Sequence, residues 1–177
     1  MFDYATAPRR GERVIHRRLS VAERQRPKCR SVAVSHLGSV VAVRFDLLSP
    51  GIEVGLVTTN LEPMIAFYEG FLGLDFQGEV EFTGGRQRRY SLGKNVLKLV
   101  TFDSPPPQPA VPGGGRAQAG VRYFTIAVQN LRDAAATFED SEYEIVEPVT
   151  EFAPVPGMGW MFVADPDGNW IELFGTL

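Results

Sequence analysis

Most of this chain consists of two copies of one pattern. Residues 51–61 (GIEVGLVTTNL) align with residues 121–131 (VRYFTIAVQNL) at an offset of 70. Residues 94–99 (KNVLKL) align with residues 168–173 (GNWIEL) at an offset of 74. Self-similarity at a nearly fixed offset indicates a repeated structural unit. The chain is therefore expected to contain two similar units, and the offsets identify equivalent positions in them.

Each copy predicts the element order β-α-β-β-β. A β-rich run of strand length opens each copy. Asn60 and Asn130 follow, and an Asn side chain can accept hydrogen bonds from the free N–H groups of a helix start. Apolar residues then recur at helical spacing, and Pro63 fits because the first turn of a helix does not use its missing N–H. Further β-rich runs flank tight turns at residues 93–95 and 165–169, which is typical of hairpins.

The two copies predict one α+β domain over residues 49–177. The repeats span residues 51–103 and 120–175, and residues 104–119 form a linker that is too rich in Pro and Gly for a core element. Units of about 55 residues bury little core alone. We therefore expect the two βαβββ units to pack about a pseudo-twofold axis and to form a curved mixed sheet around a cup.

Residues 1–48 differ from the rest of the chain in charge. They carry ten basic and four acidic residues, a net charge of +6, whereas residues 49–177 carry eight basic and seventeen acidic residues, a net charge of −9. A polar, basic stretch without periodicity predicts a disordered or loosely docked extension. The alternatives are an over-extended gene model, with translation starting near residues 40–43, and a targeting or nucleic-acid arm, which is the least favoured.

The composition of the chain indicates where in the cell the protein is expected. No apolar run reaches the roughly 18 residues that span a bilayer, so we expect no membrane partner. Cys29 is the only cysteine, so an intramolecular disulfide is impossible and a reducing, cytoplasmic location is expected.

Several short motifs resemble one known superfamily. They are residues 54–57 (VGLV), 60–61 (NL), 66–68 (AFY) with 72–74 (LGL), and 165–173 (DPDGNWIEL). With these motifs in a duplicated frame, residues 51–174 resemble the vicinal oxygen chelate (VOC) superfamily, which includes glyoxalase I, bleomycin-resistance proteins and extradiol dioxygenases. The resemblance implies a sheet-lined cup, often with a divalent metal held by four side chains, two of them typically His. It also implies a homodimer.

The resemblance places the four metal-ligand positions at Glu53, Tyr123, Lys98 and Glu172. Residues 49–177 contain no His and no Cys, which excludes nitrogen or thiolate ligation within the domain. Glu53 and Glu172 are the only remaining candidates for metal ligands and would suit a hard cation such as Mg²⁺ or Mn²⁺. The positive charge of Lys98, at another of the four positions, disfavours even such a hard cation. We predict no cofactor, and expect the Lys98 ammonium to bridge Glu53 and Glu172 while the Tyr123 hydroxyl completes the hydrogen bonds.

Other side chains are candidates for lining the cup. Arg88, Arg89 and Tyr90 could meet an anionic or aromatic ligand at the rim, and Trp160 ends a candidate lid at residues 151–160. The proposed catalytic acid/base residues are Glu172 and Tyr123. A purely structural role for the charged cluster remains open. The predicted ligand-binding set is Glu53, Lys98, Tyr123, Glu172, Arg88, Tyr90, Trp160 and Trp170.

These observations favour a binding protein of the bleomycin-resistance kind, which holds a small organic molecule without the His-based metal site. The alternative is a VOC-family lyase, isomerase or dioxygenase-type enzyme with an atypical or metal-free acid/base site. Glyoxalase I activity is disfavoured because that chemistry needs a metal to stabilise an enediolate. A regulatory domain that binds a protein partner is a third hypothesis.

Overall fold

The computed structural model describes residues 46–177. The predictions for the basic extension fall on residues outside this range, apart from residues 46–48. In the described part of the chain, no helix is long and apolar enough to cross a membrane.

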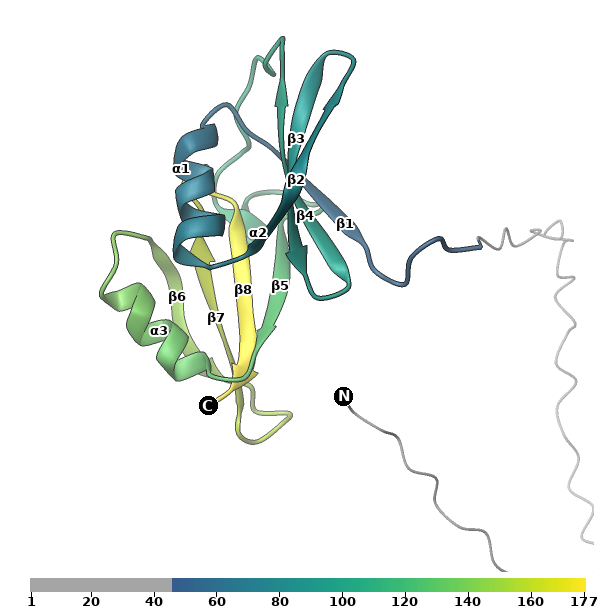
Figure 1. Ribbon diagram of the computed structural model, residues 1–177. Coiled ribbons are helices and arrows are strands. Elements are labelled where there is room, and N and C mark those ends of the chain that lie inside the picture. Colours follow the sequence, from purple (N-terminus) through teal and green to yellow (C-terminus); the bar gives the residue numbers. More distant parts are fainter. Residues whose placement is uncertain (1–45) are drawn as a thin grey trace, which may run out of the picture. The chain divides into compact units, whose positions relative to one another are not determined.

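The first repeat forms a four-stranded mixed sheet with one helical segment (Figure 1). The strand order is β1-β4-β3-β2, with β1 parallel to β4 and the other pairs antiparallel. The helix α1 continues directly as a π-helical segment, η1. The elements are β1 (Glu53–Val57), α1 (Leu61–Ile65), η1 (Ala66–Phe71), β2 (Asp75–Phe82), β3 (Gly85–Leu92) and β4 (Asn95–Phe102).

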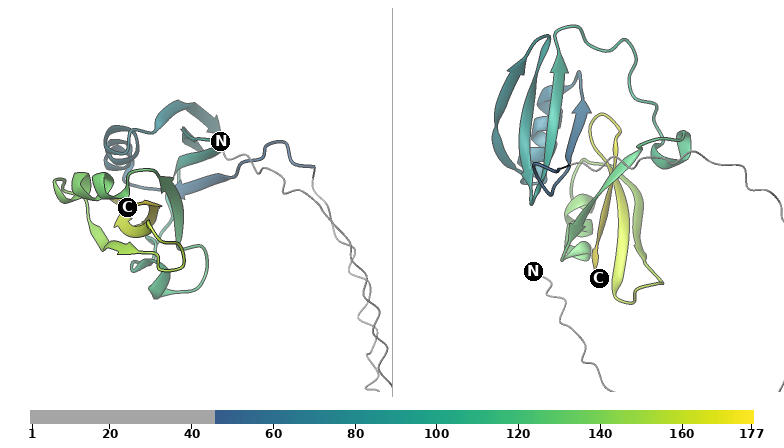
Figure 2. Two further views of the ribbon diagram at one scale, coloured as in Figure 1. Left: turned by 90° about the horizontal axis from the view of Figure 1, so that it is seen from below. Right: turned by 90° about the vertical axis from the view of Figure 1, so that its right-hand side faces the viewer.

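The second repeat has the same topology, with the strand order β5-β8-β7-β6. Its elements are β5 (Tyr123–Val128), α3 (Leu131–Glu139), β6 (Ile145–Glu151), β7 (Met158–Ala164) and β8 (Trp170–Thr176). The linker carries the short helix α2 (Gly114–Ala117). The predicted α+β class and paired βαβββ units are confirmed. The strands form two separate four-stranded sheets, and Figure 2 shows the linker running from the first sheet to the second.

The helix starts differ from the prediction in one detail. Asn60 and Asn130 do precede the two helices, but neither side chain makes a capping hydrogen bond. Their backbone carbonyls accept from Met64 and Ala134 instead, at 3.3 Å and 3.0 Å. The local sequence therefore located the helix starts correctly and assigned the wrong atom to the contact.

The core lies between the helices and the inner faces of both sheets. Side chains from both repeats belong to one buried cluster, which includes Phe67 from the first repeat and Phe138 from the second. Their rings lie 6.4 Å apart, centre to centre. The two units therefore share a single core, as expected from their small size.

A buried hydrogen bond also joins the repeats. Tyr68 donates its hydroxyl to Asp165 Oδ2 at 2.8 Å, and both residues are almost fully buried. Asp165 begins the turn before β8, and its Oδ1 accepts from the backbone N–H groups of Asp167 and Asn169. Burial raises the pKa of both Tyr68 and Asp165. One carboxylate thus organises a hairpin of the second repeat and fastens it to the helix of the first.

Candidate functional site

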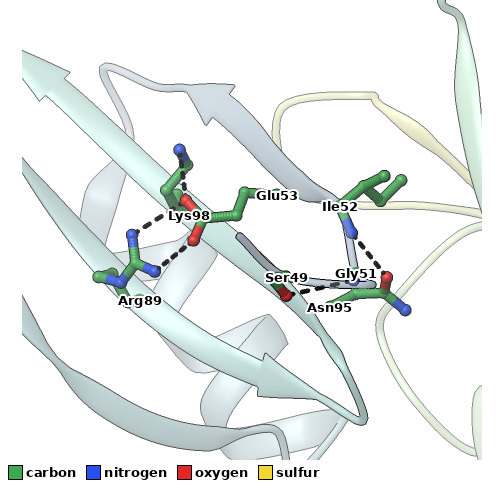
Figure 3. A network of polar contacts seen from close by, with 7 residues as sticks. All are labelled: Ser49, Gly51, Ile52, Glu53, Arg89, Asn95 and Lys98. Carbon is green, nitrogen blue, oxygen red and sulfur yellow. Dashed lines mark hydrogen bonds and ion pairs between the residues drawn. The ribbon is translucent and has the colours of Figure 1, made fainter. Parts of the chain in front are cut away.

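A charged cluster lies on the face of the first sheet that is opposite the helix. Glu53 on β1 accepts hydrogen bonds from Arg89 on β3, at 2.7 Å and 3.2 Å, and from Lys98 on β4, at 3.1 Å (Figure 3). The side chains of Arg89 and Lys98 keep 23% and 22% of their exposure, and that of Glu53 keeps 45%. We call Glu53, Arg89 and Lys98 the cationic cluster, because it holds two positive charges and one negative charge.

The strand register explains why these three side chains meet. Arg89 and Lys98 are direct cross-strand partners on β3 and β4. Like charges in this relation repel one another. Glu53 reaches both cations from the neighbouring strand and relieves that repulsion. The hydrogen bonds from Arg89, and then from Lys98, lower the pKa of Glu53 to about 2, and Glu53 in turn raises the pKa of Arg89.

Glu53 should make the fold sensitive to acid. Its pKa falls from an ordinary 4.5 to about 2 on folding, so its contribution is complete above pH 4.5 and is lost as the pH falls towards 2. We expect the urea midpoint to fall less between about pH 5 and pH 3 in Glu53→Gln than in the wild type. Glu62→Gln, at an exposed position on α1, should retain the wild-type acid response. Equal acid sensitivity in Glu53→Gln and the wild type would contradict the assignment.

Glu172 lies in the second sheet and does not complete the predicted bridge. Its Oε2 accepts a hydrogen bond from Thr125, its cross-strand partner on β5. Among the described residues, Lys98 forms an ion pair with Glu53 alone. The predicted Lys98–Glu53 contact is thus present, whereas Glu172 takes a neutral hydroxyl partner, and no described hydrogen bond joins the Tyr123 hydroxyl to this group.

Aromatic side chains gather around Phe162 in the second sheet. The ring centroid of Phe162 lies 5.1 Å from Tyr123, 5.5 Å from Trp160 and 5.4 Å from Trp170. We call these four residues the aromatic cluster. Three of them were expected from the sequence, and Phe162 was not. Phe162 lies two residues after Trp160 on β7, so period-two alternation places both side chains on the same face of the sheet.

Arg88 and Tyr90 lie on the helix-covered face of the first sheet and do not join the other candidates. Arg88 donates to the Tyr90 hydroxyl at 2.8 Å and forms ion pairs with Glu69 at 2.9 Å and Glu79 at 3.2 Å. Its guanidinium also stacks 3.9 Å from the centre of the Phe76 ring. Tyr90 is fully buried in the core. The side chains of Arg88 and Tyr90 alternate with that of Arg89 along β3, so they lie on the other face of the sheet from the cationic cluster.

A cavity of about 1110 Å³ lies between the two sheets. Its walls come from β1 and β5, which are the edge strands that face it, from the ends of β4 and β8, and from the linker. Two of the predicted ligand-binding residues, Tyr123 and Trp170, line it. The apolar lining also includes Val54, Leu56, Val57, Val96, Phe102, Pro106, Pro107, Pro109, Ala110, Val121 and Phe124.

The residues at the family's metal-ligand positions do not fit a metal ion. Within residues 46–177, no three His, Cys, Asp or Glu side chains come together in a group able to hold one. Glu53 is neutralised by two cations, and Glu172 is held by Thr125 in the other sheet. An ammonium group at Lys98 would repel the ion directly. These donors therefore provide no basis for deriving metal chemistry.

The family follows from the sequence match together with this fold. Residues 52–173 match the model of the Glyoxalase/Bleomycin resistance protein/Dioxygenase superfamily, and the chain belongs to that superfamily. No protein in a search of curated proteins matches the chain.

Solved structures share the fold. A glyoxalase family protein from Bacillus cereus superposes with a TM-score of 0.62 at 18% identity, covering 77% of this chain and 99% of its own. The glyoxalase/bleomycin resistance protein/dioxygenase domain from Frankia has a TM-score of 0.57 at 12% identity, covering 76% and 94%. The YycE protein of Bacillus subtilis has a TM-score of 0.53 at 22% identity, covering 74% and 93%.

Proposed function

We propose that this VOC-superfamily domain binds a small organic molecule in the cavity between β1 and β5, without a His-based metal site. The observation that carries the proposal is the cavity itself, which is large enough for an organic ligand and mostly apolar in its lining. Tyr123 and Trp170 add aromatic surface to the wall, and aromatic side chains contribute specific stacking as well as buried area. This is binding of the bleomycin-resistance kind, in which holding the molecule is the function.

The test uses N-phenylnaphthylamine, a neutral probe that fluoresces in apolar surroundings. We expect saturable binding to the full chain, weakened about fivefold by Val57→Asn, because a polar amide replaces apolar wall. Val80→Asn is the matched control: both valines lie on edge strands and are about half exposed, but only Val57 lines the cavity. Fluorescence titration of the three proteins gives the comparison. Absence of binding to the wild type, or equal loss in both variants, would refute the proposal.

The enzymatic alternative uses Glu172 and Tyr123 as acid/base groups. In its favour, Glu172 is the cross-strand partner of Phe162, so a carboxylate lies beside the aromatic cluster. A substrate stacked on these rings would lie close to that carboxylate.

We also propose that the protein acts in the cytoplasm as a homodimer. Ile52 and Val121, which lie beside the edge strands β1 and β5 and also line the cavity, are largely exposed apolar residues, and such surface favours association. Light scattering on the purified full chain measures the oligomeric state.

A further inference from the structure

The cationic cluster differs from the other ion-paired groups in the described part of the chain. Arg88 has two carboxylate partners, Glu69 and Glu79, and Arg116 has one, Glu147. Glu53 alone serves both Arg89 and Lys98. Within residues 46–177, the cationic cluster by itself therefore carries a net charge of +1.

We infer that Arg89 and Lys98 form a binding site for the oxyanion group, a carboxylate, sulfonate or phosphate, of a small ligand. The inference deepens the proposed function and rests on it for the remainder of that ligand. Lys98 occupies one of the positions that the resemblance assigns to metal ligands, and Arg89 is its cross-strand partner on β3. Together they select ligands by their negative charge.

Arg89 and Lys98 keep hydrogen-bond donors that Glu53 does not use. Glu53 engages two N–H groups of the Arg89 guanidinium and one of the Lys98 ammonium, and each group carries more than that. Glu53 occupies both terminal nitrogens of Arg89 with one N–H each, which leaves the Nε–H and the second N–H of each terminal nitrogen for an oxyanion. Both side chains are about one-fifth exposed, so an incoming anion can reach them while solvent screens the attraction only in part.

Glu53 holds the site ready for a ligand. It stays ionised at neutral pH and fixes both cations before any anion arrives. Pre-organisation of this kind reduces the ordering cost of binding. Because the single carboxylate cannot cancel two cations, it orients them and still leaves an attractive field for an anion.

The cationic cluster adjoins the cavity. Gly55 is the register partner of Lys98 on β1, and it lines the cavity. A Cβ atom at this position would lie 3.9 Å from Lys98 Cε, so the absence of a side chain leaves space beside the ammonium stem. Val96, the register partner of Glu53, also lines the cavity. A ligand in the cavity can therefore extend an anionic group across Gly55 to Lys98 and Arg89.

The experiment compares two probes that share an aromatic frame, neutral N-phenylnaphthylamine and anionic anilinonaphthalene sulfonate. We expect the wild-type chain to bind the anion about tenfold more tightly, the size of one charge-assisted interaction. Arg89→Gln and Lys98→Gln should each remove most of that preference, measured as the ratio of the affinities for the two probes. Lys94→Gln, which removes an exposed charge from the turn between the same two strands, should change neither affinity.

A second measurement separates failure of this inference from failure of the proposed function. The melting temperatures of the wild type, Arg89→Gln and Lys98→Gln are measured with inorganic phosphate and, separately, with acetate. If Arg89→Gln does not fold, Lys98→Gln alone is compared with the wild type. Stabilisation of the wild type alone supports the anion site even if neither aromatic probe binds, and the more effective anion indicates phosphate or carboxylate. Equal affinity for both probes without anion-dependent stabilisation, or a loss in Lys94→Gln equal to that in Arg89→Gln, would overturn the inference.

Discussion

Asp165→Ala is expected to lower the free energy of unfolding by about 3 kcal/mol. The carboxylate is 3% exposed and accepts hydrogen bonds from Tyr68, from two backbone N–H groups and from the Asn169 amide. Removing it leaves the fully buried Tyr68 hydroxyl without its acceptor and loosens the turn before β8. Urea denaturation at neutral pH measures the change.

Asp167→Ala is the matched control for this loss. Asp167 lies two residues further along the same turn and is more exposed, and its side chain forms none of the described hydrogen bonds. We expect a change below about 0.5 kcal/mol. Tyr68→Phe should cost about 1 kcal/mol of unfolding free energy. The double variant Tyr68→Phe with Asp165→Ala should cost less than the sum of the two single changes, because both remove the same Tyr68–Asp165 hydrogen bond. Equal effects of the two aspartate replacements would show that Asp165 does not join the repeats.

Phe67→Ala is expected to cost about 3–5 kcal/mol. Phe67 has no exposed surface, and its ring contacts Tyr68, Phe71 and, from the second repeat, Phe138 and Tyr143. Truncation therefore opens a cavity in the layer that both repeats share. The free energy of unfolding from urea or guanidinium titration is the measurement.

Phe82→Ala removes a ring of the same size from an exposed edge. Phe82 is 40% exposed and packs against Phe102, itself 43% exposed. We expect a loss of about 1 kcal/mol or less, since little apolar surface returns to water. If the two phenylalanine variants lost the same stability, the shared aromatic layer would not be the main junction between the repeats.

The duplicated pattern predicted the fold well because its signals are local. Strand runs, helix starts and glycine-containing turns each depend on a few neighbouring residues, and Gly73, Gly93 and Gly168 all adopt the positive φ that such turns require. The offsets then gave the equivalence of the repeats. Local signals did not distinguish one continuous sheet from two, because that depends on whether the edge strands β1 and β5 pair with each other.

The site was predicted only in part because its contacts depend on which strands pair and in which register. Alternation separates Arg89 from Arg88 and Tyr90, but the sequence does not say which face the helix covers. Glu69 on η1 settles this point by holding Arg88 and Tyr90 on its own side. The partner of Glu172 likewise depends on the parallel register of β5 and β8, which places Thr125 beside it.

For the proposed ligand binding, the linker that lines the cavity allows specificity to change independently of folding. Residues 106–110 form part of the wall, yet they belong to no strand or helix and are exposed along their whole length. Substitutions there alter the shape offered to a ligand and leave the buried layer intact. During evolution, substitutions in this segment can therefore change which ligands are bound while the stability of the folded domain is preserved.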